Sequence, residues 1–358
     1  MSIKEIAKKA GVSPSTVSRV LNNPDYRCSS EELRRRIWEC AIALNYAPNE
    51  AARKLKLGKG KDKKKTYYVH VLLTHTDQVA MDPFFRELLD CVETEVHSNF
   101  CALTQVWINS LFSDDALCVK TDLVRVIDDM RKEAGTQADG LIIIGRCNAK
   151  ALTLWKKRYR SVVSINRNPT EGLVDEITCD GCKVSNMAVR HLVELGHERI
   201  AYVGECAGEA RYQGYLKALR DAGIDLCEEY VFDLKQSRPE PNVLLKKMMT
   251  LKNPPTGVYC SNDIIAVGLL WALQNARGNL YHPSIIASDD IEEGQRTKPM
   301  LTTVRLFKED MGRHAMYLLL DRLRGGHEGV ISMDIRPQLV VRGSTAPQDS
   351  VGWLSYHG

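Results

Sequence analysis

The sequence lacks any segment that would hold the chain in a membrane or export it. No apolar run approaches the roughly 18 residues that a membrane helix needs. The first residues predict a charged helix without the apolar core of a signal peptide. We therefore expect a cytoplasmic protein with no membrane partner.

The chain also lacks the residue patterns of metal sites and of common enzymes. Its 11 cysteines are widely spaced, and the close pair Cys179 and Cys182 has no second pair or histidine at zinc spacing. The sequence has no G-x-x-x-x-G-K-[ST], no G-x-G-x-x-G after the first strand, no H-E-x-x-H and no G-x-S-x-G. We predict reduced thiols, no metal, no cofactor and no catalytic residues. His197 is expected to be structural.

Positive charge, in contrast, is concentrated at the N-terminus. Residues 1–65 hold 16 Lys and Arg against 7 Asp and Glu, a net charge of +9, whereas the whole chain carries only +4. The remaining residues have 33 basic and 38 acidic side chains. This asymmetry is typical of a basic nucleic-acid-binding module joined to an ordinary globular body. The length allows two or three domains.

Three short helices are predicted within the first 45 residues. Gly11 permits a tight turn after the first helix. Ser13 is expected to cap the second, with Pro14 at its first position. A third helix should start near residues 29–30. This order is typical of a helix-turn-helix unit, although a plain three-helix bundle would show the same spacing.

The outer face of the second helix carries side chains suited to contact with DNA. It presents small hydroxyls, one guanidinium and one amide, namely Ser15, Thr16, Ser18, Arg19 and Asn22. Groups of these kinds read base edges or phosphates in a major groove. Val17, Val20 and Leu21 are expected to pack inward.

A short basic segment follows the three helices. Residues 50–57 favour a helix but are too few to be stable alone in water, so the segment is expected to fold against a partner. Leucines among small and basic residues suit a wedge that enters a minor groove. Residues 58–65 predict a flexible basic linker.

From residue 67 onward, short apolar runs alternate with helical segments. Strands are predicted at 67–74, 102–106, 140–144, 162–165, 199–203 and 257–260, and helices at 83–98, 123–133, 182–195, 210–222, 264–274 and 311–324. Repeated strand-helix units predict a parallel sheet with helices on both faces. Such sheets bind ligands at the carboxyl ends of their strands.

These motifs together resemble the LacI/GalR family of bacterial transcription regulators. The resemblance rests on residues 3–13, Thr16-Val-Ser-Arg-Val-Leu-Asn22, 44–49, 51–55, 192–204, 261–268, 299–304 and 339–345. It implies an α/β fold, with an N-terminal three-helix helix-turn-helix DNA-binding domain (1–47), a hinge helix and linker (48–66), and an effector-binding and dimerisation core (67–358). The core is expected to be periplasmic-binding-protein-like, with two doubly wound parallel-sheet subdomains and three crossings of the chain. Their expected ranges are about 67–164 plus 292–327 and about 165–291 plus 328–345.

The resemblance implies a set of DNA-binding residues. Pro14 and Ser15 match the two variable base readers, and Arg19 matches the guanine reader. Leu55, flanked by Ala52, matches the hinge leucine that enters the minor groove. The full expected set is Ser13, Pro14, Ser15, Thr16, Ser18, Arg19, Asn22, Ser30, Tyr46, Asn49, Ala52 and Leu55. Leu33 replaces a usual threonine, and one residue is inserted within 24–28.

The resemblance also implies an effector pocket. Arg211 matches the arginine that family members aim at the effector, and Asp289 matches an acidic residue at the pocket floor. A guanidinium and a carboxylate can hold adjacent sugar hydroxyls. Asn262 and Asn166 match further pocket positions, the latter where an aspartate is usual. Phe84 is expected either to stack on a sugar ring or to belong to the core.

The function implied is allosteric repression of a carbohydrate-utilisation operon. A homodimer would bind a pseudo-palindromic double-stranded DNA operator and be released by a small-molecule effector, a sugar. A regulator that responds to a purine or a partner protein is the alternative. The basic module argues against a sugar-binding protein without a regulatory role. Because the C-terminal tail has no leucine heptads, a tetramerising coil is not expected.

Overall fold

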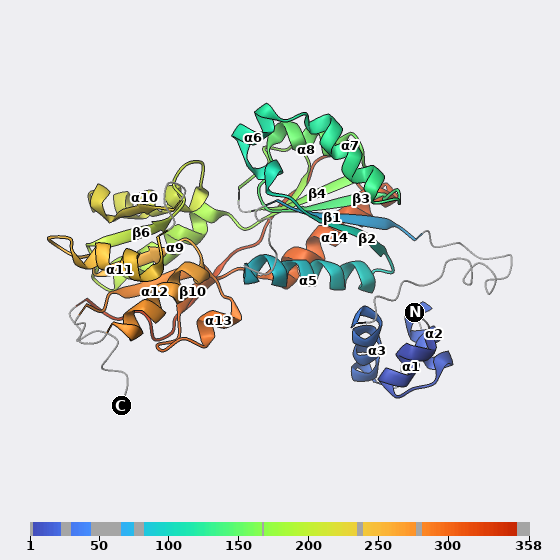
Figure 1. Ribbon diagram of the computed structural model, residues 1–358, viewed down its shortest axis with the longest axis horizontal. Coiled ribbons are helices and arrows are strands. Elements are labelled where there is room, and N and C mark those ends of the chain that lie inside the picture. Colours follow the sequence, from blue (N-terminus) through green and yellow to red (C-terminus); the bar gives the residue numbers. More distant parts are fainter. Residues whose placement is uncertain are drawn as a thin grey trace. The chain divides into compact units, whose positions relative to one another are not determined.

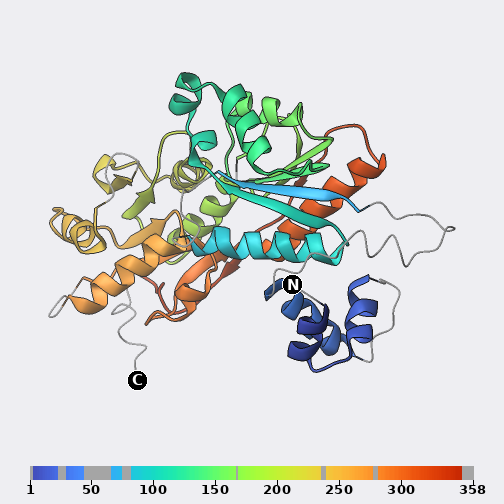
Figure 2. The same cartoon turned by 45° about the vertical axis from the view of Figure 1, so that its right-hand side comes forward.

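The chain divides into two units, Met1–Lys65 and Thr66–Gly358. The computed structural model (Figures 1 and 2) describes residues 3–22, 30–43, 66–74, 82–166, 168–234, 239–276 and 281–348. Within these ranges no helix is long and apolar enough to cross a membrane. We describe each unit by itself.

The first unit contains three helices, α1 (Ile3–Ala10), α2 (Pro14–Asn22) and α3 (Glu31–Ala43). Gly11 has a φ of +68° in the turn between α1 and α2, a conformation that costs glycine little. The three helices bury one aliphatic core, made of Ile6, Ala7, Ala10, Val17, Val20, Leu21, Ile37 and Ala41. The predicted helix-turn-helix unit is confirmed.

The second unit begins with a six-stranded sheet in the order β11-β5-β4-β3-β1-β2. Its strands are β1 (Tyr68–Leu73), β2 (Ala102–Ile108), β3 (Gly140–Ile144), β4 (Ser161–Asn166), β5 (Asp175–Thr178) and β11 (Ser332–Asp334). All of its pairings are parallel. We call this sheet and the helices that cover it the first lobe.

Helices cover both faces of the first sheet (Figure 1). One face packs against α5 (Pro83–Ser98) and α14 (Lys308–Arg324), and the other lies under α6 (Asp115–Lys120), α7 (Leu123–Glu133) and α8 (Ala149–Lys156). At Gly312 of α14, an added Cβ would lie 3.2 Å from the backbone of Cys91 in α5. A side chain at that position would therefore push the two helices apart.

A second six-stranded sheet has the order β12-β10-β9-β8-β6-β7. It contains β6 (Ile200–Gly204), β7 (Val231–Asp233), β8 (Gly257–Cys260), β9 (Ser284–Asp289), β10 (Thr302–Arg305) and β12 (Gln338–Val340). The helices of this lobe are α9 (Gly181–Glu194), α10 (Ala210–Asp221), α11 (Pro241–Met249), α12 (Asp263–Asn275) and the short α13 (Glu292–Gln295). Only β12 pairs antiparallel among the described strands. We call this part the second lobe.

The chain passes between the lobes at other positions than expected. β5 lies within the range 165–291 expected for the second subdomain, yet it pairs with β4 and β11 in the first sheet. β10 lies within 292–327, expected in the first subdomain, but pairs with β9 and β12 of the second sheet. Short, partly polar strands such as Asp-Glu-Ile-Thr in β5 give no apolar run that would predict them.

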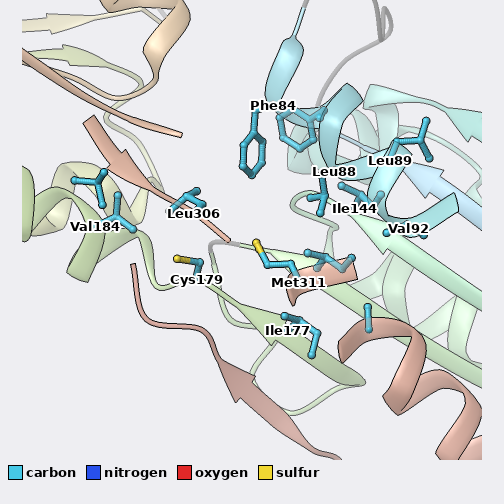
Figure 3. Close-up of a cluster of buried hydrophobic side chains, with 14 of the residues drawn as sticks. Phe84, Leu88, Leu89, Val92, Ile144, Ile177, Cys179, Val184, Leu306 and Met311 are labelled. Atoms are coloured by element: carbon cyan, nitrogen blue, oxygen red, sulfur yellow. The ribbon is translucent and has the colours of Figure 1, made fainter. Parts of the chain in front are cut away.

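One apolar core extends through both lobes. It includes the faces of the sheets that pack against α5 and α14 in the first lobe and against α9 and α10 in the second. Figure 3 shows Cys179 and Leu306, from segments that connect the lobes, and Met311 of α14, between Val184 on α9 and Ile144 on β3. Leu318, Leu319 and Leu323 of α14 are buried in this core.

Candidate functional site

Helix α2 separates its apolar and polar residues onto different faces. Val17, Val20 and Leu21 are buried in the core of the unit. The exposed residues are Ser13, Pro14, Ser15 and Arg19, and Thr16 and Ser18 are half-buried. The outer face is therefore available to a partner, as the sequence predicts.

Two of the predicted DNA-binding residues also stabilise helix ends. The Ser13 hydroxyl accepts a hydrogen bond from Thr16 N at 3.1 Å and lies 2.7 Å from Ser15 Oγ. The Ser30 hydroxyl accepts from Leu33 N at 3.1 Å and caps α3. Tyr46, Asn49, Ala52 and Leu55 lie outside the described residues, as does the side chain of Asn22.

In the second unit, the residues predicted for the effector pocket follow the carboxyl ends of strands or begin the next helix. Asn166 ends β4, Asn262 follows β8, Asp289 ends β9, and Arg211 lies in the first turn of α10 after β6. In parallel sheets these ends lie along one edge, where ligands bind. Both lobes contribute this edge to one cleft.

A cavity of about 430 Å³ lies between the lobes. From the first lobe it is lined by Phe84, Phe85, Leu88, Ser113, Asp114, Asp115, Ala116, Gly145, Arg146, Ile165, Asn166 and Met311, and from the second-lobe side by Asn168, Glu205, Ala207, Gly208, Glu209 and Arg211. Its volume is in the range of small-molecule sites. The sequence analysis identified three of these residues, Phe84, Asn166 and Arg211.

Three of the five N–H donors of the Arg211 guanidinium bond to protein groups. Its Nε and Nη2 donate to the two carboxylate oxygens of Glu209 at 2.8 and 3.0 Å, and Nη1 donates to the carbonyl oxygen of Ser261 at 2.7 Å. Burial alone would lower the pKa of Arg211, but the Glu209 carboxylate raises it. The arginine therefore stays charged although its side chain is only 8% exposed.

A second cavity of about 430 Å³ lies on the other side of this ion pair. It shares Glu205, Glu209 and Arg211 with the first cavity. Its other lining residues are Asp82, Gly204, Leu234, Pro239, Pro241, Leu244, Ser261, Asn262, Ile264, Ile265 and Leu269. The Asn262 side chain accepts from Ile265 N at 3.0 Å and so caps α12. The Arg211–Glu209 pair thus forms the wall between two parts of the cleft.

Asp289 borders neither of these two cavities, although it was expected at the pocket floor. Its side chain is buried and acts electrostatically on Arg211. Asp289 and Asp290 have φ angles of +143° and +53°, conformations that cost about 1–3 kcal/mol each in a non-glycine residue. Lys308 Nζ donates to the carbonyl oxygens of both, at 3.1 and 3.2 Å, and so holds this backbone in place.

Lys308 bonds to both lobes and lies next to the wall of the first cavity. The residue begins α14 in the first lobe, and the two carbonyls that it binds belong to the second. Its ammonium group pairs with Glu87 of α5 at 2.7 Å and lies 5.7 Å from the ring centroid of Phe84. Phe84 lines the first cavity. A ligand in that cavity would therefore touch a residue that contacts Lys308, which bonds to both lobes.

Asp263 is a second buried carboxyl group in the same region. Its oxygens accept from Thr303 Oγ1 at 2.6 Å and from Ile291 N at 3.0 Å. Burial raises the pKa of Asp263 to about 7, and the nearby Asp289 adds to this effect. The side chain ties α12 to β10 and to the loop after β9.

Several cleft residues were not identified from the sequence. Glu205, Glu209, Arg146 and Asp115 have no motif of their own, and neither has Lys308, which lies behind the cavity wall. The available signal was position, since Glu205 follows β6 and Gly145-Arg146 follows β3. His197, by contrast, is structural as predicted, because its ring bonds to Thr256 and to the carbonyl oxygen of Ala346.

Comparison with known proteins defines the class of this two-unit architecture. Residues 2–49 match the model of bacterial regulatory proteins of the lacI family, and residues 189–345 match a periplasmic binding protein-like domain. The HTH-type transcriptional repressor PurR of Photorhabdus laumondii is 30% identical over 354 residues, 96% of this chain and 96% of that protein.

Solved structures share the fold. A transcriptional regulator CelR–cellobiose complex superposes with a TM-score of 0.64 at 21% identity, over 96% of this chain and 100% of that one. The lac repressor dimer bound to operator and an anti-inducer gives a TM-score of 0.61 at 20% identity, over 97% and 99% of the two chains.

The chain belongs to the lacI family of bacterial regulatory proteins. It is a DNA-binding transcriptional regulator with a periplasmic-binding-protein-like body, and the expectation that it is not an enzyme agrees with this membership.

Proposed function

We propose that the protein is a repressor that leaves its operator when a sugar binds in the cleft between the lobes. The observation that carries this proposal is the cavity at the carboxyl ends of both sheets, lined by aromatic rings, carboxylates and amides. These groups suit the apolar faces and the hydroxyls of a sugar. The named repressor among the relatives, and the cellobiose in the CelR structure, support it.

Operator reading is assigned to the exposed face of α2. Arg19 and Ser15 would contact base edges, with Pro14 beside them, while Ser13 and Ser30 position helix ends near the phosphate backbone. The segment 48–66 is assigned to the hinge, with Leu55 as the minor-groove residue. A protein that reads operator DNA acts where the chromosome is, so we place it in the cytoplasm.

The response to the effector would pass through the contacts between the lobes. Lys308 bonds to both lobes and lies against Phe84 at the cavity wall. A ligand in the cleft would shift the lobes toward the arrangement in which it makes the stronger contacts. The hinge segments of two protomers would then separate on the operator.

Homodimerisation is assigned to an exposed apolar surface on α11 and α12. Val243 and Trp271, on the packed helices α11 and α12, are 48 and 54% exposed, and neighbouring exposed apolar side chains mark interaction surfaces. We expect Trp271→Glu to shift the protein toward monomers in sedimentation velocity. Val119→Glu, at an 81% exposed site on α6, is the matched control. Equal association of both variants would contradict this assignment.

A gel-shift titration tests the proposed function. The full-length protein would be bound to its operator, identified by selection from random duplexes, and titrated with neutral sugars, sugar phosphates and purines. We expect a neutral sugar to release the operator. Release by a purine, or by none of these compounds, would contradict the sugar assignment and favour the purine or protein-partner alternative.

A further inference from the structure

Both arginines that line the first cavity within the described residues are already paired with carboxylates. Arg211 binds both oxygens of Glu209, and the two side chains are only 8 and 13% exposed. Arg146 pairs with Asp115, whose other oxygen accepts from Asn148 Nδ2 at 2.6 Å. Neither guanidinium presents a positive charge that lacks a counterion.

The other charged groups that line the two cavities are acidic. The two cavities together are lined by five carboxylates, Asp82, Asp114, Asp115, Glu205 and Glu209, against the two guanidiniums Arg146 and Arg211. Their formal charge is therefore −3. An anion that enters such a space meets net repulsion, which is strongest beside Glu209, whose side chain is only 13% exposed.

We propose that the cleft selects an uncharged, hydroxyl-bearing ligand over an anion, and that Glu209 is the residue that determines this specificity. The inference rests on the proposed function only in taking the cleft as the effector site. An anion that binds Arg211 either displaces Glu209, and leaves a nearly buried carboxylate without its main partner, or binds the remaining donors beside that carboxylate and is repelled by it.

A hydroxyl group avoids this conflict. Arg211 has five N–H donors, of which three serve Glu209 and Ser261, so it can donate further bonds without losing them. The carboxylate of Glu209 can accept from a hydroxyl while it stays paired. The ion pair therefore binds a neutral polyol as a unit that both donates and accepts.

Inorganic phosphate is a probe that tests the charge filter without knowledge of the effector. By isothermal titration calorimetry of the full-length protein, we expect no phosphate binding at millimolar concentration to the unchanged protein. Glu209→Gln keeps the shape of the side chain but releases the guanidinium charge, so we expect its phosphate affinity to rise by about tenfold or more. Equal phosphate affinity of both proteins would overturn the proposal.

Glu194→Gln is the matched control, because it removes the same charge at an exposed pair with Arg190 on α9. A gain in phosphate affinity with this variant as large as with Glu209→Gln would show a general charge effect and overturn the assignment to Glu209. Glu209→Ala provides a second variant, for which the same gain is expected. Thermal unfolding would verify that each variant is folded.

Sugar and sugar-phosphate pairs separate this inference from the proposed function. For any sugar that releases the operator, we expect its phosphorylated form to bind the unchanged protein about tenfold more weakly. Binding of the phosphorylated form as tight as that of the sugar would overturn the charge filter and leave the sugar-responsive repressor intact. If no sugar acts, the proposed function fails while the phosphate titrations still decide the specificity of the cleft.

Discussion

Helix α2 and the cleft keep their candidate functional groups in opposite places. On α2, Arg19 and Ser15 are exposed and the apolar residues alone form the core. In the cleft, Arg211 and Glu209 are buried or nearly so and pair with each other, and Lys308 beside it is buried and binds Glu87 and main-chain carbonyls. Function can therefore be changed on α2 at little cost in stability, whereas a change in the cleft alters folding as well.

The largest effect on stability is expected from Arg211→Ala. The variant removes the guanidinium that neutralises the Glu209 carboxylate, while the Ser261 carbonyl keeps its bond from Ser288 Oγ, and breaking a buried ion pair costs about 3–5 kcal/mol. Urea unfolding measures the loss. Arg190→Ala is the control, since its pair with Glu194 is 63 and 64% exposed and is expected to contribute about 0–1 kcal/mol. Similar losses of unfolding free energy in both variants would mean that the ion pair in the cleft stabilises the fold no more than the exposed pair.

Arg211→Ala should also lose its response to the effector while operator affinity stays near normal. The reason is that Arg211 lines both cavities but lies in the unit that does not contain α2. A gel shift with and without effector measures both properties. A retained response would contradict the assignment of Arg211 to the pocket.

Arg19→Ala is expected to have the next largest effect, on binding alone. Loss of a base contact costs about 1–3 kcal/mol of discrimination, whereas an exposed side chain contributes within about 0.5 kcal/mol to stability. Competition gel shifts at one fixed salt concentration compare operator and unrelated DNA. Arg35→Ala, 73% exposed on α3, removes the same charge and should weaken both DNAs alike. Equal losses on both DNAs with Arg19→Ala would exclude base reading.

Ser13→Ala tests a residue that is predicted to contact DNA and also stabilises the start of α2. Its hydroxyl caps α2 through Thr16 N, so its removal should destabilise the helix by about 1 kcal/mol. Hydrogen exchange of the amides of residues 14–22 in the full chain reports this loss. Ser15→Ala, at the next exposed serine, should leave exchange nearly unchanged. If only the Ser15 variant exchanged faster, Ser13 would not be the residue that caps α2.

The same difference in placement explains what the sequence could predict. In α2 the apolar residues Val17, Val20 and Leu21 recur at helical spacing, so they predict the face that packs in the core. The polar residues between them predict the binding face. Likewise, the body helix 83–98 and the strand 140–144 have the predicted bounds, because each contains a strong apolar pattern.

The cleft was predictable only where strand ends could be located. Arg211, Asn166 and Asn262 follow recognisable strands and line the cavities. Glu209 could not be assigned to Arg211, because the carboxylate takes its role from a side-chain rotamer and from Ser261 at the end of another strand. Lys308 gave no signal, since its partners Asp289 and Glu87 are distant in sequence and in different lobes.

The buried His70 and the half-buried His327 of the first lobe should respond to pH in opposite directions. Their effects on stability near neutral pH are expected to be the smallest of those discussed. His70 lies within an aromatic cluster, 2.7 Å from Tyr159 Oη, and burial lowers its pKa from 6.5 to about 4, with a smaller contribution from Arg131. Burial would also lower the pKa of His327, but hydrogen bonds to Asp321 and Asp175 raise it.

The sign of each contribution follows from which state binds the proton. Between pH 6.5 and about 4 the unfolded chain protonates His70 and the folded protein does not, so stability falls as the pH falls. His327 contributes stability at low pH and loses it as the pH rises through its raised pKa. We expect His70→Gln to flatten the acid limb of the unfolding free energy measured from pH 7 to 5. His327→Gln should lose more stability at pH 6 than at pH 8. Parallel pH profiles for the two variants would contradict both assignments, because they would mean that neither ring exchanges its proton in the way that its contacts require.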